Sequence, residues 1–287
     1  MRADDVPAAE RLSSLGYYEL DTRTYQRGWP DPVPRDATRG SAWVERTTHL
    51  LVTDPEGCWV AEADGELVGA AVSYTRELLW LLASYVVRPG LQGQGIGTQL
   101  LAASLHHGRG CLRGMLAASP DPKAVRHYRL AGFALHPQMV LWGAVRRDAI
   151  PVVERVRDGS PGDFDLLDSV DRRTRGAAHG ADHEVLARQF HLLVTDRSTG
   201  SGYAYVDDSG SPALVASTNR RTATDLTWAA LAASNPDVPV EIAHVTAANQ
   251  WVIDVGMAAR LELHQRGYLA LRNLAPPAPY LHHGSFL

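Results

Sequence analysis

The chain has little cysteine and no long hydrophobic run. Cys58 and Cys111 are the only cysteines among 287 residues, too few for a disulfide framework, so a reducing compartment is expected. No stretch of about 18 apolar residues is present, and no basic leader precedes an apolar stretch, which excludes a membrane span and a secretion signal. From these absences we predict a cytoplasmic protein with no membrane partner.

The chain also lacks an excess of positive charge. Its 28 Lys and Arg residues, almost all arginine, are outnumbered by 32 Asp and Glu, for a formal net charge of −4. Nucleic-acid-binding proteins usually present a basic face, so no nucleic-acid partner is expected. The length exceeds that of one ordinary hydrophobic core and suggests two domains of about 140 residues each.

A glycine-rich turn between two patterned segments is the most informative feature. The apolar run from Leu78 to Val87 predicts a buried strand that ends before Pro89, and residues 98–105 predict a helix. Glycines at 93, 95 and 97 let the backbone approach a ligand closely. A strand, a glycine turn and a helix start together expose backbone N–H groups at the positive end of a helix dipole, which suits a pyrophosphate.

Other phosphate motifs fit this turn less well. The P-loop needs Gly-Lys followed by Ser or Thr, which the chain does not contain. A Rossmann fingerprint opens the first helix of a βαβ unit, whereas this turn follows several predicted strands. An ordinary strand-to-helix connection remains the structural alternative, because a glycine-rich turn alone is weak evidence of a site.

A second segment, residues 121–133, has the pattern of a capped helix. Asp121 can serve as N-cap, Pro122 occupies the first helical position, and Gly132 ends the helix. Tyr128 falls on its apolar face, where a tyrosine by itself is more often part of the core than a catalyst.

Together the two segments resemble the acyl-CoA motifs of the GCN5-related N-acetyltransferase (GNAT) family. The family's Gln/Arg-x-x-Gly-x-Gly/Ala matches Gln92, Gly95 and Gly97, and its upstream Val-x-Pro matches residues 87–89. Residues 121–133 reproduce the family's spacing of Asn, Ala, Tyr and Gly-Phe, with Asp121 where Asn is usual. That departure puts in doubt the amide contact that the family's Asn makes to the pantetheine arm.

The resemblance implies that acetyl-CoA binds as acyl donor, without a metal. It implies that a backbone N–H, that of Val87, stabilises the oxyanion and that Tyr128 protonates the departing thiolate. The cofactor-binding residues that it implies are Tyr85, Val86, Val87, Gln92, Gly93, Gln94, Gly95, Ile96, Gly97, Thr98 and Asp121. The general base is unassigned, because no acidic residue stands on the strand from Leu78 to Val87.

An internal repeat indicates two related domains. The six letters from His49 to Asp54 recur from His191 to Asp196, and a hairpin pattern follows each copy. We predict a tandem α/β fold of the acyl-CoA N-acyltransferase type, each domain a central twisted mixed sheet flanked by helices. Residues 1–148 would form a GNAT domain with the acetyl-CoA site. Residues 152–287 would form a degenerate GNAT-like domain, since no glycine turn follows its corresponding strand.

The local patterns predict helices over residues 6–15, 43–53 and 184–193 and a strand over 152–157. The segment 17–46 between the first two helices is rich in aromatic, acidic and proline residues. The family's equivalent region covers the substrate cleft, and aromatics with carboxylates suit a cationic amine. An ordinary surface loop is the alternative.

The apolar tail, residues 279–287, predicts a docked rather than a frayed terminus. Its carboxylate would either act as the missing base in the acceptor cleft or merely anchor the last strand. The pairs His106-His107 and His282-His283 lack the spacing of other ligands that a metal site needs, so we interpret them as structural.

Two functions remain open. The preferred one is transfer of an acetyl group from acetyl-CoA to a primary amine of a small molecule or a protein, directly within a ternary complex, by a monomer or a homodimer. Tandem members of the family include mycothiol synthases, which the chain resembles in architecture. The alternative is a non-catalytic acyl-CoA-binding sensor or regulatory protein, in which Tyr128 is a core residue.

Overall fold

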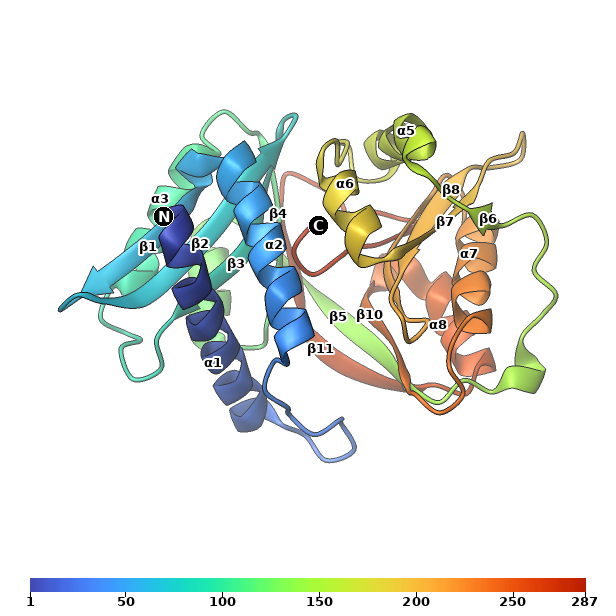
Figure 1. Cartoon of the computed structure of the whole chain (residues 1–287), viewed down its shortest axis with the longest axis horizontal. Helices are drawn as coiled ribbons and strands as arrows, with labels where there is room; N and C mark the ends of the chain where they lie inside the picture. The colour runs from blue at the N-terminus through green and yellow to red at the C-terminus, as the bar shows by residue number, and fades with distance from the viewer. The chain divides into compact units, whose positions relative to one another are not determined.

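The computed structural model describes all 287 residues, which divide into two compact units, Met1–Phe133 and Ala134–Leu287 (Figure 1). The first unit has a four-stranded sheet in the order β1-β2-β3-β4. Only β3 and β4 run parallel; the other neighbours are antiparallel. Its elements are α1 (Val6–Thr24), α2 (Ala37–Thr53), β1 (Cys58–Ala63), β2 (Glu66–Arg76), β3 (Leu79–Val87), α3 (Ile96–His107), β4 (Arg113–Ala118) and α4 (Pro122–Leu130), with short 3₁₀ turns at Ala3–Asp5 and Pro55–Gly57.

Helices cover both faces of this sheet. On one face, α1 and α2 pack against it through a cluster that contains Leu12, Trp43 and Val86. On the other face, α3 lies close enough to β2 that a Cβ at Gly69 would meet Leu100 at 2.7 Å. The β1–β2 connection is the predicted Asp64-Gly65 hairpin turn, and both residues have positive φ, 52° and 78°. Two left-handed residues in a two-residue loop match the twist of the strands.

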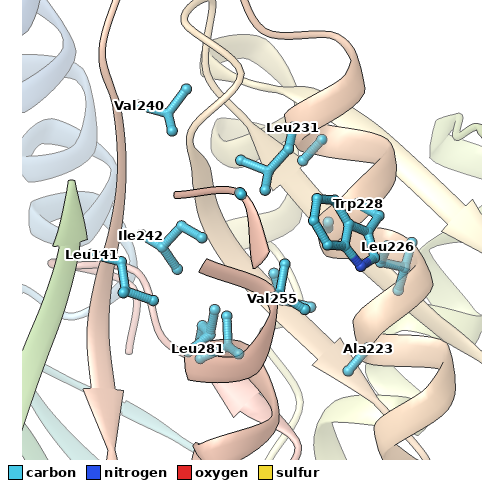
Figure 2. Close-up of a cluster of buried hydrophobic side chains, with 14 of the residues drawn as sticks. Leu141, Ala223, Leu226, Trp228, Leu231, Val240, Ile242, Val255 and Leu281 are labelled. Atoms are coloured by element: carbon cyan, nitrogen blue, oxygen red, sulfur yellow. The ribbon is translucent and has the colours of Figure 1, made fainter. Parts of the chain in front are cut away.

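The second unit has two sheets. One has the order β11-β5-β10, and the other has the order β12-β9-β8-β7-β6. Side chains from α7, α8, β5 and β10 meet in its core (Figure 2). Its elements are β5 (Ala134–Gly143), β6 (Arg157–Asp158), α5 (Phe164–Thr174), α6 (Asp182–Gln189), β7 (His191–Thr195), β8 (Gly202–Val206), β9 (Pro212–Ser217), α7 (Arg220–Ala232), β10 (Val240–Thr246), α8 (Gln250–Ala258), β11 (Glu262–Arg272) and β12 (Tyr280–Leu281), with 3₁₀ turns at Arg147–Ala149, Pro161–Asp163 and Ala247–Asn249.

The order of elements repeats along the chain. Two helices, three strands, a helix, a strand, a helix and a strand follow one another from α1 to β5 and again from α5 to β11. The predicted mixed α/β tandem architecture is therefore present. The compact units part at residue 133, because β5 pairs with β10 and β11. The boundaries at 1–148 and 152–287, drawn from the sequence repeat, stay a proposal.

The six-letter repeat does not occupy equivalent elements. His49–Thr53 ends helix α2, whereas His191–Thr195 is strand β7. In the helix Leu50 is buried and Val52 is 77 % exposed, while in the strand residues 192–195 are all buried and pair with β8. The helix predicted over 184–193 is therefore confirmed over 184–189 and wrong over 190–193, because α6 ends at Gln189. A short apolar run that contains a β-branched residue is compatible with both helix and strand periodicity. Its tertiary contacts therefore decide which of the two it forms.

Three further boundaries differ from the predictions. Helix α2 begins at Ala37 rather than at residue 43. Helix α1 runs on to Thr24, so Tyr17 and Tyr18 lie on a helix rather than in an irregular segment. The strand predicted over 152–157 is only the two-residue β6, Arg157–Asp158. None of the helices is both long and apolar enough to span a bilayer.

The two copies of the repeat allow a matched test of context. Val52→Ala should change the free energy of unfolding by less than about 0.5 kcal/mol, because the side chain is largely in water. Val194→Ala should cost roughly 2–3 kcal/mol, because it empties a fully buried site. Urea denaturation of both variants checks this, and equal costs would contradict the different environments.

Candidate functional site

The first unit contains a cavity of about 270 Å³ where the ends of β3 and β4 meet α1, the glycine turn and α4. Each of these elements contributes wall residues. The lining comprises Gly16, Tyr17, Glu19, Leu20, Arg23, Tyr85, Val86, Val87, Pro89, Gln92, Gly93, Gly95, Gly97, Thr98, Ala117, Ser119, Asp121, Lys123, Ala124, His127 and Tyr128.

The cavity exists because β3 and β4 stop pairing before they end. Their parallel register runs from Leu79↔Arg113 to Leu82↔Leu116 and no further. On the other side of β3, the register with β2 shifts between Ser84 and Leu82, which leaves Ala83 as a bulge. A bulge bends a strand and increases its twist. The last four residues of β3 are thus paired with β2 alone.

The direction of the free backbone groups follows from one hydrogen bond. The N–H of Arg88 donates to the carbonyl of Val68 at 2.8 Å, which makes this a hydrogen-bonded pair of the antiparallel ladder. Because such pairs alternate, Val86 also turns its N–H and C=O toward β2, whereas Tyr85 and Val87 turn theirs away. The backbone of Tyr85 and Val87 therefore faces the side that β4 has vacated, where an extended ligand can add as a strand.

The glycine turn meets this open edge. The Gln92 side chain donates from Nε2 to the Val87 carbonyl at 3.3 Å and so ties the turn to the strand end. Gly93 and Gly95 have φ of 89° and 88°, and a Cβ at either would meet no protein atom within 4 Å. Their conformation favours glycine, and the space beside them is open to a ligand.

Helix α3 begins directly at Gly95, its N-cap. The N–H of Gln99 donates to the Gly95 carbonyl at 3.1 Å, so the N–H groups of residues 96–98 precede the first helical hydrogen bond. These donors and the positive end of the helix dipole form an anion site beside the cavity.

Gly97 is required for a different reason. A Cβ at this position would lie 2.5 Å from the Tyr85 hydroxyl. Glycine thus lets that hydroxyl sit between α3 and α4, where it is 3.4 Å from His127 Nδ1. Burial raises the pKa of Tyr85 to about 12, so it remains a proton donor at neutral pH. Tyr85 was predicted to contribute only its backbone, so a role of this hydroxyl was not predicted.

Asp121 caps helix α4 as predicted. Its Oδ1 accepts from the N–H groups of Lys123 at 2.8 Å and Ala124 at 3.2 Å, and its Oδ2 accepts from Arg23 Nη2 at 2.6 Å. Both oxygens are therefore engaged by the protein. The carboxylate fastens α1 to the start of α4, and it cannot donate a hydrogen bond as the family's amide does.

Tyr128 lines the cavity and is only 4 % exposed. Its ring packs against that of Tyr85, with centroids 6.0 Å apart. Burial, and secondarily Tyr17, Tyr85 and Asp121, raise the pKa of Tyr128 well above its ordinary value near 10. The hydroxyl is accordingly a proton donor and not a base around neutral pH.

The structure brings ten of the twelve predicted site residues to the cavity wall; Gln94 and Ile96 are not on it. Helix α1 supplies lining residues that sequence reasoning missed, among them Gly16, Leu20 and Arg23. Their spacing of four and three residues marks one helix face, a signal hidden by the prediction that this helix ends at residue 15.

The predicted docking of the tail is confirmed within the second unit. Phe286 and Leu287 are both fully buried, and the Leu287 carbonyl accepts from the Arg175 guanidinium. The contact favours the anchoring role of the tail over the catalytic one.

Part of the chain matches known proteins. Residues 15–133 match the family model described as Acetyltransferase (GNAT) family. The mycothiol acetyltransferase of Streptomyces avermitilis is 40 % identical over 88 residues, which are 29 % of this chain and 29 % of that protein. That of Streptomyces coelicolor is 38 % identical over 88 residues, 29 % of this chain and 28 % of that protein. The chain thus matches less than a third of the length of these relatives.

Solved structures share the fold over the whole chain. A putative acetyltransferase from Pyrococcus horikoshii aligns with a TM-score of 0.73 at 18 % identity and covers 100 % of this chain and 93 % of its own. A GCN5-related N-acetyltransferase from Sphaerobacter thermophilus gives 0.60 at 15 % identity, with 95 % and 93 % covered. The glycine turn, the capped helix and the family match over residues 15–133 together support membership of the GNAT family.

Proposed function

We propose that the first unit binds acetyl-CoA and transfers its acetyl group to a primary amine of a small molecule or a protein, directly in a ternary complex. The open edge of β3 beside the glycine turn is the observation that supports this most strongly. It offers the Val87 N–H, the helix N-terminus at Gly95 and the Tyr128 hydroxyl to one cavity.

In this proposal each part of acetyl-CoA has a matching surface. The pyrophosphate would accept hydrogen bonds from the N–H groups of residues 93–98. The pantetheine arm would extend along the backbone of Tyr85 and Val87 as an added strand. Lys123 also lines the cavity, and its positive charge favours the negatively charged ligand. Asp121 would act through the position of α4, since both its oxygens are engaged.

The transfer step then needs three events. The neutral amine attacks the thioester carbonyl carbon, and the Val87 N–H stabilises the oxyanion that forms. The C–S bond breaks, and the thiolate of coenzyme A takes the proton of Tyr128. The amine gives its extra proton to a base that we leave unassigned; Glu19 is a carboxylate on the cavity wall, and it is exposed.

We further propose that the second unit binds no acetyl-CoA. The helix that corresponds to α3 is α7, and its N-terminus is already capped: Asn219 Oδ1 accepts from the Thr222 N–H at 3.0 Å. The same side chain donates from Nδ2 to the Thr199 carbonyl at 2.9 Å, which holds another loop over the helix start. A phosphate would have to displace both contacts.

A second candidate function is an acyl-CoA-binding sensor without catalysis. The lack of an identified base favours it, and in that case Tyr128 is a packing residue. Release of free thiol from acetyl-CoA in the presence of a panel of amines, including cysteinyl and lysyl amines, separates the two functions. Thiol release above the amine-free rate supports transfer, while binding without release supports the sensor.

The glycine turn offers a matched pair of variants. Gly95→Ala should reduce the affinity for coenzyme A at least tenfold, because it strains the turn and places a methyl group where the phosphates approach. Gly65→Ala imposes similar strain at φ 78° in the distant hairpin and should leave the affinity unchanged. Calorimetry measures both, with one site per chain expected for the wild type; two equivalent sites would contradict the proposal for the second unit.

Tyr128 is tested by removing its hydroxyl. Tyr128→Phe should lower kcat on the order of 10²-fold with the KM for acetyl-CoA little changed. Because burial raises the pKa of Tyr128, the wild-type kcat should climb with pH as the amine deprotonates and should fall only above about pH 10, as the tyrosine loses its proton. Unaltered turnover in the variant would leave Tyr128 as packing.

A further inference from the structure

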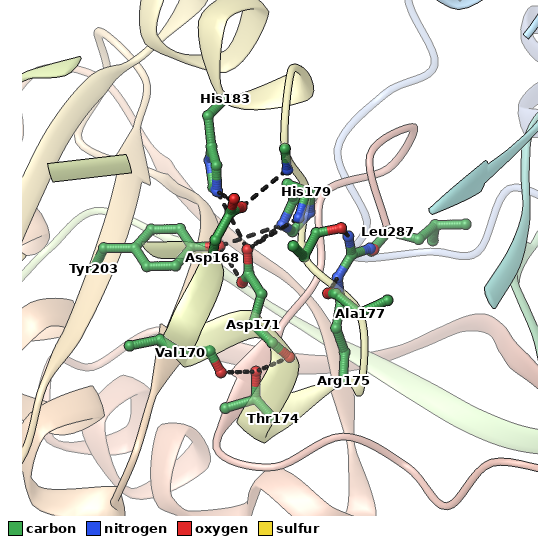
Figure 3. Close-up of polar contacts among 12 residues, drawn as sticks. Asp168, Val170, Asp171, Thr174, Arg175, Ala177, His179, His183, Tyr203 and Leu287 are labelled. Carbon is green, nitrogen blue, oxygen red and sulfur yellow. Dashed lines mark hydrogen bonds and ion pairs between the residues drawn. The ribbon is translucent and has the colours of Figure 1, made fainter. Parts of the chain in front are cut away.

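The second unit contains a buried cluster of acidic and imidazole groups (Figure 3). Asp168 and Asp171 lie three residues apart on α5, while His179 lies in the loop before α6 and His183 lies in the first turn of α6. Asp171 and both histidines have no exposed surface, and the Asp168 side chain is 20 % exposed. The proposed acetyl transfer uses none of them.

Both ring nitrogens of His183 lie close to oxygen atoms of other side chains. Its Nδ1 lies 3.1 Å from the Tyr205 hydroxyl, a hydrogen-bond distance. Its Nε2 lies 3.2 Å from Asp171 Oδ2 and 3.3 Å from Asp168 Oδ1, yet it is not aligned for a hydrogen bond with either. A proton on Nε2 would pair with these carboxylates, whereas with the proton on Nδ1 the Nε2 lone pair faces both of them, and a cation between the three groups would stabilise that arrangement.

These separations match a metal site. In a tetrahedral zinc site with bonds of about 2.0–2.1 Å, neighbouring ligand atoms lie about 3.3 Å apart. One ligand atom each from Asp171, His179 and His183 lies within 4.8 Å of the other two.

We propose that Asp171, His179 and His183, with Asp168 as the fourth ligand, bind one Zn²⁺ ion in the second unit. His179 Nδ1 is now 2.7 Å from Asp171 Oδ2, a hydrogen-bond distance. Binding through Nδ1 would lengthen this separation to about 3.3 Å by a small rotation of the ring. Imidazole nitrogens favour Zn²⁺ over Mg²⁺ or Ca²⁺, which prefer oxygen ligands throughout.

Neighbouring groups already orient the ligands. The Tyr203 hydroxyl donates to Asp171 Oδ1 at 2.5 Å, and the Gly180 N–H donates to Asp168 Oδ1 at 2.9 Å. Such outer contacts fix ligand geometry in metal sites. Asp171, His179 and His183 have no exposed surface, so the ion would have a structural role and clamp α5 to α6.

The Arg175 guanidinium does not take the place of the proposed metal ion. Arg175 is fully buried and directs its guanidinium to the carbonyl groups of Ala177, Ala178 and Leu287. The loop that carries His179 is thereby tied to the docked tail. Loss of the ion should therefore loosen α6 and the tail together.

The test begins with the full chain refolded from denaturant in the presence of a chelator. Zn²⁺ titrated against a chromophoric chelator should bind at one ion per chain, and Co²⁺ should give the visible absorption of a tetrahedral site. At about a hundredfold excess of Zn²⁺ over its Kd the Tm should rise by roughly 5–10 °C. Mg²⁺ at the same concentration should leave the Tm unchanged. A folded wild-type chain that binds no Zn²⁺ would overturn the proposal and identify the cluster as an internal ion network.

Variants locate the ion. His183→Ala and Asp171→Asn should each abolish stoichiometric binding, whereas His191→Ala, which removes an exposed histidine of the same unit, should retain it. Retention of one Zn²⁺ by both His179→Ala and His183→Ala would place the ion elsewhere and contradict the site. If the variants do not fold, X-ray absorption of the wild-type zinc complex decides, because the proposal requires two imidazole ligands and no sulfur.

Discussion

The separation of β3 from β4 is the constraint on which the candidate active site depends. Pairing ends at Leu82 and Leu116, and the bulge at Ala83 turns the remainder of β3 away from its parallel neighbour. A buried backbone with unpaired N–H and C=O groups is costly, so the gap is sustained only because it is open to solvent or to a ligand. The edge at Tyr85 and Val87, the turn tied by Gln92 and the buried Tyr128 all surround that gap.

The two units show how one order of elements can carry different chemistry. In the first unit the helix after the third strand begins at a left-handed glycine, and its first N–H groups are available. In the second unit the equivalent helix begins at Asn219, whose side chain caps it and holds a neighbouring loop. The difference lies in a few residues at one helix start rather than in the fold. A repeated architecture therefore does not imply a repeated ligand site.

Local patterns were enough to predict the parts of the site that depend on local geometry. The glycine turn, the Asp121 cap and the Asp64-Gly65 hairpin follow from backbone conformations that few residues adopt, and all three are present. The first ten residues of α1 were predicted and its last nine were not, because none of residues 16–24 is buried. Because these nine residues were not predicted to be helical, the contributions of Leu20 and Arg23 to the cavity were not predicted either.

Features that depend on distant partners could not be predicted. The same six letters form a helix end at His49 and a strand at His191, since β8 pairs with the second copy and not with the first. The end of β3–β4 pairing leaves no mark in either strand's sequence. The Asp168, Asp171, His179 and His183 cluster does have regular spacings, three and four residues, but its convergence depends on how α5 and α6 pack.

The central claim, that acetyl-CoA binds along the open edge of β3 and at the N-terminus of α3, is tested most directly by amide hydrogen exchange of the full chain with and without coenzyme A. We predict slower exchange at the amides of Tyr85 and Val87 and across residues 93–98, because these N–H groups would donate to the ligand. Residues 219–222 at the start of α7 should exchange at an unchanged rate. Protection confined to the second unit, or none at saturating coenzyme A, would contradict the account.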